Sequence, residues 1–190
     1  MITVLIKKIE NIENDELDAI VSTLSDSAKK RLNKKRNQEL FLSSVCALSL
    51  LTNEQRADID YLGGGAPFFK TLDADISISH SKTYAVVAIS DSKKSCVGVD
   101  IEDNIKSPST RFLTENEQTA LENGTPYTEI WTKKEALFKF LKSDSTPFIL
   151  LDSTSPEKHG AQFSTYHIYG STASICTPLG SQIDVKKLPK

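Results

Sequence analysis

Two acidic residues close an apolar segment near the middle of this 190-residue chain. The segment is Val97-Gly98-Val99-Asp100-Ile101-Glu102 and is typical of a strand, in which residues i and i+2 face the same side. Asp100 and Glu102 can therefore converge on one hard cation such as Mg²⁺, which prefers carboxylate oxygens as protein ligands. The alternative is a strand that ends in solvent with two hydrated acids.

A second group of charges lies in Trp131-Thr132-Lys133-Lys134-Glu135-Ala136-Leu137-Phe138-Lys139. A helix here puts Glu135 and Lys139 one turn apart on the same face. Taken alone, this pattern is equally that of an ordinary surface ion pair. Together with the two carboxylates at 100 and 102, however, Glu135 would add a third carboxylate and Lys139 a cation. That combination can hold a metal-bound diphosphate.

Candidate anion-binding residues occur earlier in the chain. His80 follows an apolar strand and stands between Ser79 and Ser81, which favours either a structural hydrogen bond or a phosphate site. A basic run forms either a solvated helix face or a polyanion site; it comprises Lys29, Lys30, Arg31, Lys34, Lys35 and Arg36. The sequence contains no G-x-x-x-x-G-K-[ST], H-E-x-x-H or G-x-S-x-G motif, so those nucleotide-binding and hydrolytic chemistries are not indicated.

Hydrophobic patterns predict the elements that carry these residues. We expect strands at 2–9, 76–79, 84–89, 96–102, 162–169 and 172–177, and a loop at the glycines 63–65. Helices are expected from a cap at Asn14 to about 24, from about 27 to 51, from a Thr114 capping box to 123, and from Thr125-Pro126 to about 142. This order predicts an α+β fold, which we interpret as two similar halves, 1–97 and 98–190.

Composition excludes several classes of protein. A net charge of −2 gives no general basic surplus for nucleic-acid binding. No run of about 18 apolar residues indicates a membrane span, and the short apolar start at 1–8 has no cleavage-site pattern, so we do not expect export. Cys46, Cys96 and Cys176 show neither disulfide nor metal-ligand spacing. We therefore expect reduced thiols in a cytoplasmic protein.

Four motifs, taken in their order along the chain, resemble the phosphopantetheinyl transferases of the surfactin-synthetase type. They are I-S-H-S at 78–81, V-G-V-D-I-E at 97–102, F-L-T-E-N-E at 112–117 and W-T-K-K-E-A-L-F-K at 131–139. The resemblance covers about residues 29–142. It implies a pseudo-twofold pair of α+β halves with coenzyme A in the cleft between them.

The resemblance also implies a role for each candidate residue. The Mg²⁺ ligands would be Asp100, Glu102 and Glu135, and Lys139 would lie close to the diphosphate. Near the 3′-phosphate of coenzyme A would be Ser79 and His80, with Lys29, Lys30 or Arg31 on the coenzyme's phosphates. The implied reaction moves phosphopantetheine to a serine of an apo-acyl or peptidyl carrier protein. Glu135 is then the candidate base, and a monomer suffices because both halves lie in one chain.

Two positions depart from the family pattern. The family usually has Gly-Lys-Pro where this chain has Gly65-Ala66-Pro67, and an arginine where Ala47 aligns. Weaker coenzyme A affinity, an altered donor, or a degenerate member that only binds coenzyme A or a carrier are therefore alternatives. Another Mg²⁺-dependent phosphoryl or nucleotidyl transferase would use the same carboxylates. Because those carboxylates are intact, we favour an active transferase.

Overall fold

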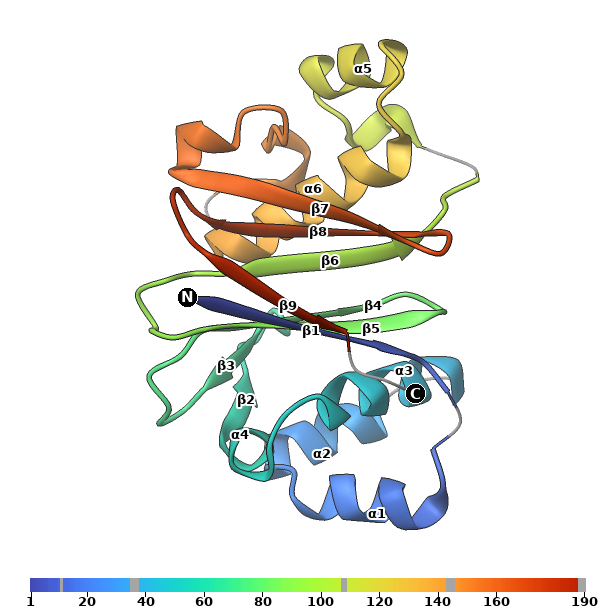
Figure 1. Cartoon of the computed structure of the whole chain (residues 1–190), viewed down its shortest axis with the longest axis vertical. Helices are drawn as coiled ribbons and strands as arrows, with labels where there is room; N and C mark the ends of the chain where they lie inside the picture. The colour runs from blue at the N-terminus through green and yellow to red at the C-terminus, as the bar shows by residue number, and fades with distance from the viewer. Residues whose placement is uncertain (11, 35–37, 107–108, 143–145, 188–190) are drawn as a thin grey trace.

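The computed structural model describes residues 1–10, 12–34, 38–106, 109–142 and 146–187 (Figure 1). The strands are β1 (Ile2–Lys8), β2 (Ile59–Tyr61), β3 (Pro67–Phe69), β4 (Ile76–His80), β5 (Tyr84–Ser90), β6 (Gly98–Asp103), β7 (Ala161–Ile168), β8 (Ser171–Pro178) and β9 (Ile183–Lys187). The α-helices are α1 (Asn14–Ser22), α2 (Asp26–Asn33), α3 (Gln38–Ser49), α4 (Asn53–Asp58), α5 (Glu115–Glu122) and α6 (Tyr127–Leu141). Short 3₁₀ helices η1 (Thr110–Phe112), η2 (Phe148–Leu150) and η3 (Pro156–His159) complete the described elements.

These elements stack as helices, sheet, sheet and helices (Figure 1). The first sheet has the strand order β4-β5-β1-β9 and the second has the order β6-β8-β7, while β2 and β3 form a separate hairpin. Helices α1 to α3 pack on the outer side of the first sheet, and α6 packs on the second. A continuous apolar core fills the space between the two sheets.

Strand β1 shows why both faces of the first sheet are apolar. Side chains alternate along a strand, so Ile2, Val4 and Ile6 point into the core between the sheets. Leu5 faces the opposite way and packs against the core beneath the helices. The near-continuous apolar sequence of this strand therefore follows from its burial on two sides.

The predicted α+β class is confirmed, with most of its strands and helices. The helix expected from 27 to 51 is wrong in one respect, because α2 and α3 are separate helices. The amide of Lys34 bonds to the carbonyl of Arg31 at 3.2 Å, a tight i−3 bond that ends α2. Asn14 is the first residue of α1 rather than its cap. Lys35 and Arg36 of the basic run lie outside the described residues.

The pseudo-twofold duplication and the division at residue 97 stay predictions. Strand β9, at the end of the chain, pairs in parallel with β1 and so joins the sheet built from the first ninety residues. No sequence pattern had predicted β9, the α4 helix or the β2–β3 hairpin.

Two further expectations concern the environment of the protein. Within the described ranges, we find no helix that is both long enough and apolar enough to cross a bilayer. Cys46, Cys96 and Cys176 are free thiols, as the sequence predicts.

Candidate active site

The candidate site lies where strand β4 of the first sheet runs beside strand β6 of the second. The two strands are joined by side chains instead of a backbone ladder: Val97 N donates to Asp75 Oδ2 at 2.9 Å, and Val99 N donates to Ser77 Oγ at 3.0 Å. Farther along, Ser81 Oγ donates to Asp103 Oδ1 at 2.9 Å. Because side chains alternate between the two faces of a strand, the polar side chains along β4 all point towards β6.

Helix α6 crosses β6 closely because position 98 is a glycine. A Cβ there would lie 1.9 Å from Ala136 O and 2.5 Å from Phe140 N, both of which belong to the α6 backbone. Only a residue without a side chain permits this approach. The close approach of the helix and the strand brings Glu135 and Lys139 of α6 next to Asp100 and Glu102 of β6.

Lys139 and Asp100 form the centre of the site. Lys139 Nζ donates to Asp100 Oδ1 at 2.6 Å, to the Val99 carbonyl at 3.1 Å and to Ser79 Oγ at 3.2 Å. Ser79 Oγ in turn donates to Asp100 Oδ1 at 2.7 Å. Asp100 is only 3% exposed, so this cluster contains a charge pair at the seam between the two sheets.

Glu102 and Glu135 are half-buried beside this pair. Burial raises the pKa of Glu102 to about 7; the charge of Asp100 adds to the rise and Lys139 opposes it. Burial also raises the pKa of Glu135 above its ordinary value, again with Asp100 adding and Lys139 opposing. Because the raised pKa values of Glu102 and Glu135 come from burial beside the charge of Asp100, a cation bound among these side chains would favour the charged forms of both glutamates.

The chemistry of these donors fits Mg²⁺. Asp100 Oδ2 is buried and has no hydrogen-bond partner among the described residues, so one ligand oxygen is desolvated and unused. The carboxylates are not yet close enough together to coordinate one ion, because across the described ranges no three His, Cys, Asp or Glu residues are placed to hold a metal ion. Lys139 supplies the positive charge at Asp100 in this structure. The assignment of Asp100, Glu102 and Glu135 as ligands stays a proposal.

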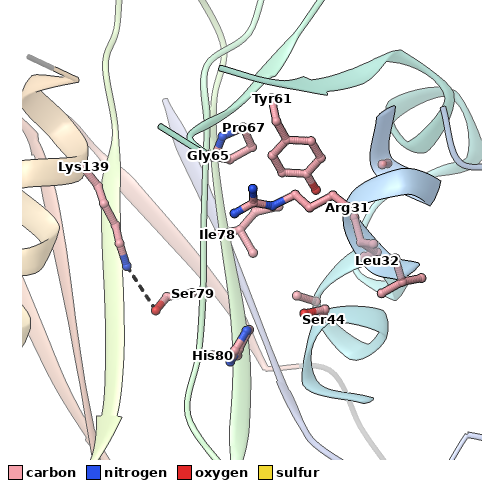
Figure 2. A pocket seen from close by; sticks show the side chains of 13 residues that line it. Arg31, Leu32, Ser44, Tyr61, Gly65, Pro67, Ile78, Ser79, His80 and Lys139 are labelled. Atoms are coloured by element: carbon pink, nitrogen blue, oxygen red, sulfur yellow. Dashed lines mark hydrogen bonds between the residues drawn. The ribbon is translucent and has the colours of Figure 1, made fainter. Parts of the chain in front are cut away.

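A pocket of about 240 Å³ opens beside this cluster (Figure 2). Its polar lining includes four predicted site residues, Arg31, Ser79, His80 and Lys139. The rest of the lining is Ala28, Leu32, Ser44, Ala47, Leu48, Tyr61, Gly65, Pro67 and Ile78. Figure 2 shows Lys139 and Arg31 entering from opposite sides, with Ser79 and His80 on the strand between them.

The structure separates the three cations predicted to contact the coenzyme. Arg31 lines the pocket, whereas Lys29 and Lys30 do not. Lys29 Nζ instead donates to the Ser22 carbonyl at 3.4 Å, and Lys30 is exposed. Ala47, one of the two positions that lack a family cation, does line the pocket and presents only a methyl group.

A buried ion pair lies under α6 and was not predicted as a pair. Lys134 Nζ donates to Glu117 Oε2 at 2.8 Å, and both side chains are fully buried. Glu117 also accepts from Thr114 N at 2.8 Å and from Ser153 N at 2.9 Å. The T-x-x-E capping box signalled Glu117, but its pairing with Lys134 depends on the tertiary packing of α5 against α6.

A family model described as the 4′-phosphopantetheinyl transferase superfamily matches residues 96–185. The matched segment contains Asp100, Glu102, Glu135 and Lys139. A search of curated proteins finds no match.

The match supports an enzyme of the phosphopantetheinyl transferase type, a class that uses coenzyme A and acts on carrier proteins. Membership of the surfactin-synthetase type stays a prediction.

Proposed function

We propose that this protein transfers the 4′-phosphopantetheine arm of coenzyme A to a serine of an apo-carrier protein and releases 3′,5′-ADP, in a Mg²⁺-dependent reaction. The observation that carries this proposal is the buried Asp100 carboxylate beside the pocket: Lys139 bonds to one oxygen, and the other has no partner among the residues described. The superfamily match covers the same residues.

The candidate metal ligands are Asp100, Glu102 and Glu135. When bound there, Mg²⁺ would neutralise charge on the diphosphate and polarise its phosphorus–oxygen bonds. Lys139 would stabilise negative charge that develops on the phosphate oxygens during transfer. Its own contact with Asp100 keeps its ammonium group in place before substrate arrives.

Glu135 is the candidate general base. As a proposed metal ligand, Glu135 would lie close to the diphosphate and therefore to the serine that attacks it, within reach of the serine proton. The serine oxygen forms a bond to the phosphorus of the pantetheine phosphate, the bond from that phosphorus to 3′,5′-ADP breaks, and the serine proton passes to Glu135 directly or through water. The reaction needs no further co-reactant.

A second candidate is a module that binds coenzyme A or a carrier without transfer. Ala47 favours it, because this residue places a methyl group in the pocket where the family pattern has a cation. Each lost charged contact is worth about 1.5–3 kcal/mol of binding. Calorimetry with coenzyme A, compared with transfer by the same protein, separates the two candidates.

The decisive experiment incubates the protein with coenzyme A, Mg²⁺ and a panel of apo-carrier proteins and measures carrier mass. We expect a gain of one phosphopantetheine that is lost with Glu135→Gln and on chelation of the metal. Glu129→Gln is the matched control, because Glu129 lies on α6 but pairs with Lys133 away from the pocket. No mass gain on any carrier by folded protein that binds coenzyme A would favour the binding module.

A further inference from the structure

Helix α6 reaches the first sheet through two lysines that lie one turn apart. Lys139 Nζ donates to Ser79 Oγ of β4 at 3.2 Å (Figure 2). Lys142, three residues later, donates a hydrogen bond to Asp75 Oδ1 and forms an ion pair with it. Neither Lys142 nor Asp75 is among the described residues that line the pocket, so this second pair does not contact a ligand bound there.

Asp75 is a well-fixed acceptor just before β4. Its amide donates to Ser90 Oγ at 2.9 Å, and the Ser90 amide donates to the Asp75 carbonyl at 2.9 Å. The second oxygen of its carboxylate accepts from Val97 N at 2.9 Å. With Lys142 bonded to the first oxygen, the Asp75 side chain joins the first sheet, the residue before β6 and the end of α6.

The two lysines lie on opposite sides of the close contact between α6 and β6 at Gly98. Lys139 bonds to the carbonyl of the residue after Gly98, and Lys142 bonds to Asp75, which holds the amide of the residue before it. Apolar packing around this contact has no preferred direction, whereas a hydrogen-bonded ion pair does. The second pair therefore opposes a rotation of α6 about the contact, which would move Lys139 away from Asp100.

The backbone of Lys142 also indicates that its side chain has a role. Lys142 is the C-cap of α6 and has a φ of +46°, in the left-handed region. Glycine is the usual residue at such a helix end, because a side chain costs free energy in this conformation. A lysine is therefore the less favourable residue for ending the helix, and its ion pair with Asp75 offsets that cost.

We propose that Lys142 and Asp75 are positioning residues, which hold the last turn of α6 so that Lys139 meets Asp100 before a substrate binds. This inference rests on the proposed function for the role of Lys139 at the diphosphate. Lys142 touches no reacting group and acts on transfer through Lys139. Loss of the pair should expose the Lys139 amine and lower kcat, while KM for the carrier stays unaltered.

The first test measures the position of Lys139 without catalysis, by brief acetylation of lysine amines and mass spectrometry. Lys139 Nζ donates to Asp100, to the Val99 carbonyl and to Ser79, so it should react slowly in the wild type. Lys142→Met should raise its rate of acetylation about 3- to 10-fold, as for weakening of one such hydrogen bond. Lys142→Arg keeps a charge and a donor, and should restore the rate to within about twofold of the wild type.

Two further variants separate positioning from charge and from stability. Lys133→Met is the matched control, because Lys133 also lies on α6, is similarly exposed (27% against 24% for Lys142) and pairs with Glu129 of the same helix. It should leave acetylation of Lys139 unchanged. Lys142→Gly removes the cation but relieves the left-handed backbone, so it should be at least as stable to urea as Lys142→Met and still expose Lys139. A purely structural role predicts instead that acetylation follows stability.

The second test is a double-mutant cycle on transfer. Lys142→Met should lower kcat about 10- to 100-fold, as for a displacement of a catalytic group by up to about 1 Å. In a Lys139→Met protein the same change should lower kcat by less than about twofold, because two residues that act as a unit are not additive.

Two results would overturn the inference. One is unchanged acetylation of Lys139 in both Lys142→Met and Lys142→Gly; the other is a pair of kcat effects that add fully in the cycle. Failure of the proposed function has a different signature, since it appears as a wild-type protein that modifies no carrier. The acetylation test then decides the inference by itself, because it requires neither coenzyme A nor a carrier.

Discussion

Replacing Gly98 with alanine tests the central packing contact of the site. The new Cβ would lie 1.9 Å from Ala136 O, whereas ordinary van der Waals contact begins at about 3.4 Å. Strand β6 and helix α6 must therefore open by roughly 1.5 Å, since the obstructing atoms are backbone and cannot rotate away. An opening of this size would stretch the 2.6 Å contact between Lys139 and Asp100 to about 4 Å, beyond hydrogen-bonding range.

The expected cost is large in both stability and rate. Overpacking of this kind destabilises by about 3 kcal/mol, equivalent to a fall in Tm of about 6–12 °C for a chain of this size. Misplacement of catalytic groups by about 1 Å lowers kcat about 100-fold. Chemical denaturation gives the first quantity, and carrier modification under saturating coenzyme A gives the second.

The matched control is Gly63→Ala, where the added Cβ meets nothing within 4 Å. It should change stability by less than about 0.5 kcal/mol and leave transfer intact. A Gly98→Ala protein with the denaturation midpoint and kcat of the wild type would refute the claim that this glycine sets the distance between α6 and β6.

Three further predictions concern other contacts. Lys134→Met should destabilise the protein by about 3–5 kcal/mol in urea because it leaves the Glu117 charge buried and unpaired, and removing that charge as well with Glu117→Gln should recover part of the loss. Asp58→Asn should cost about 2 kcal/mol at pH 7; burial alone would raise the Asp58 pKa, but hydrogen bonds from Leu72 N and Thr71 outweigh it and lower the pKa. The stability difference should therefore be full above pH 4 and shrink as the pH falls through the lowered pKa, measured by denaturation across pH. Asp100→Asn should abolish Mg²⁺-dependent transfer while circular dichroism stays native, and full activity in this variant would remove Asp100 from the metal site.

Local sequence signals predicted the elements whose structure depends on neighbouring residues. The capping box at Thr114 and Glu117 forms both of its hydrogen bonds, and the helix after Pro126 runs to Leu141 as expected. These signals work because a cap or an amphipathic face is determined within a few residues. Strand β9 gave no such signal, since its place beside β1 depends on residues almost the whole chain apart.

The contacts between the two sheets were beyond sequence reasoning for a related reason. The alternation of Ile76, Ser77, Ile78 and Ser79 predicted a strand with one polar face, and such a face normally lies in solvent. Here Ser77 is 4% exposed and accepts a bond from Val99 N, and Ser79 meets Asp100. Only the fold reveals that the polar face is buried against a second strand.

The buried hydrogen bonds between β4 and β6 explain how the site can be rigid and still offer a carboxylate oxygen to a ligand. Hydrogen bonds from side chains fix β4 to β6, so Asp100 is held without a backbone ladder between the strands. Lys139 donates a hydrogen bond to one oxygen of Asp100, and the other oxygen is buried and has no partner in the part of the chain that the structure describes. An unsatisfied buried carboxylate oxygen costs free energy in the fold, which binding of a cation would recover. The contacts that join the two sheets therefore also leave Asp100 Oδ2 as an oxygen to which the metal ion of the proposed transferase could bind.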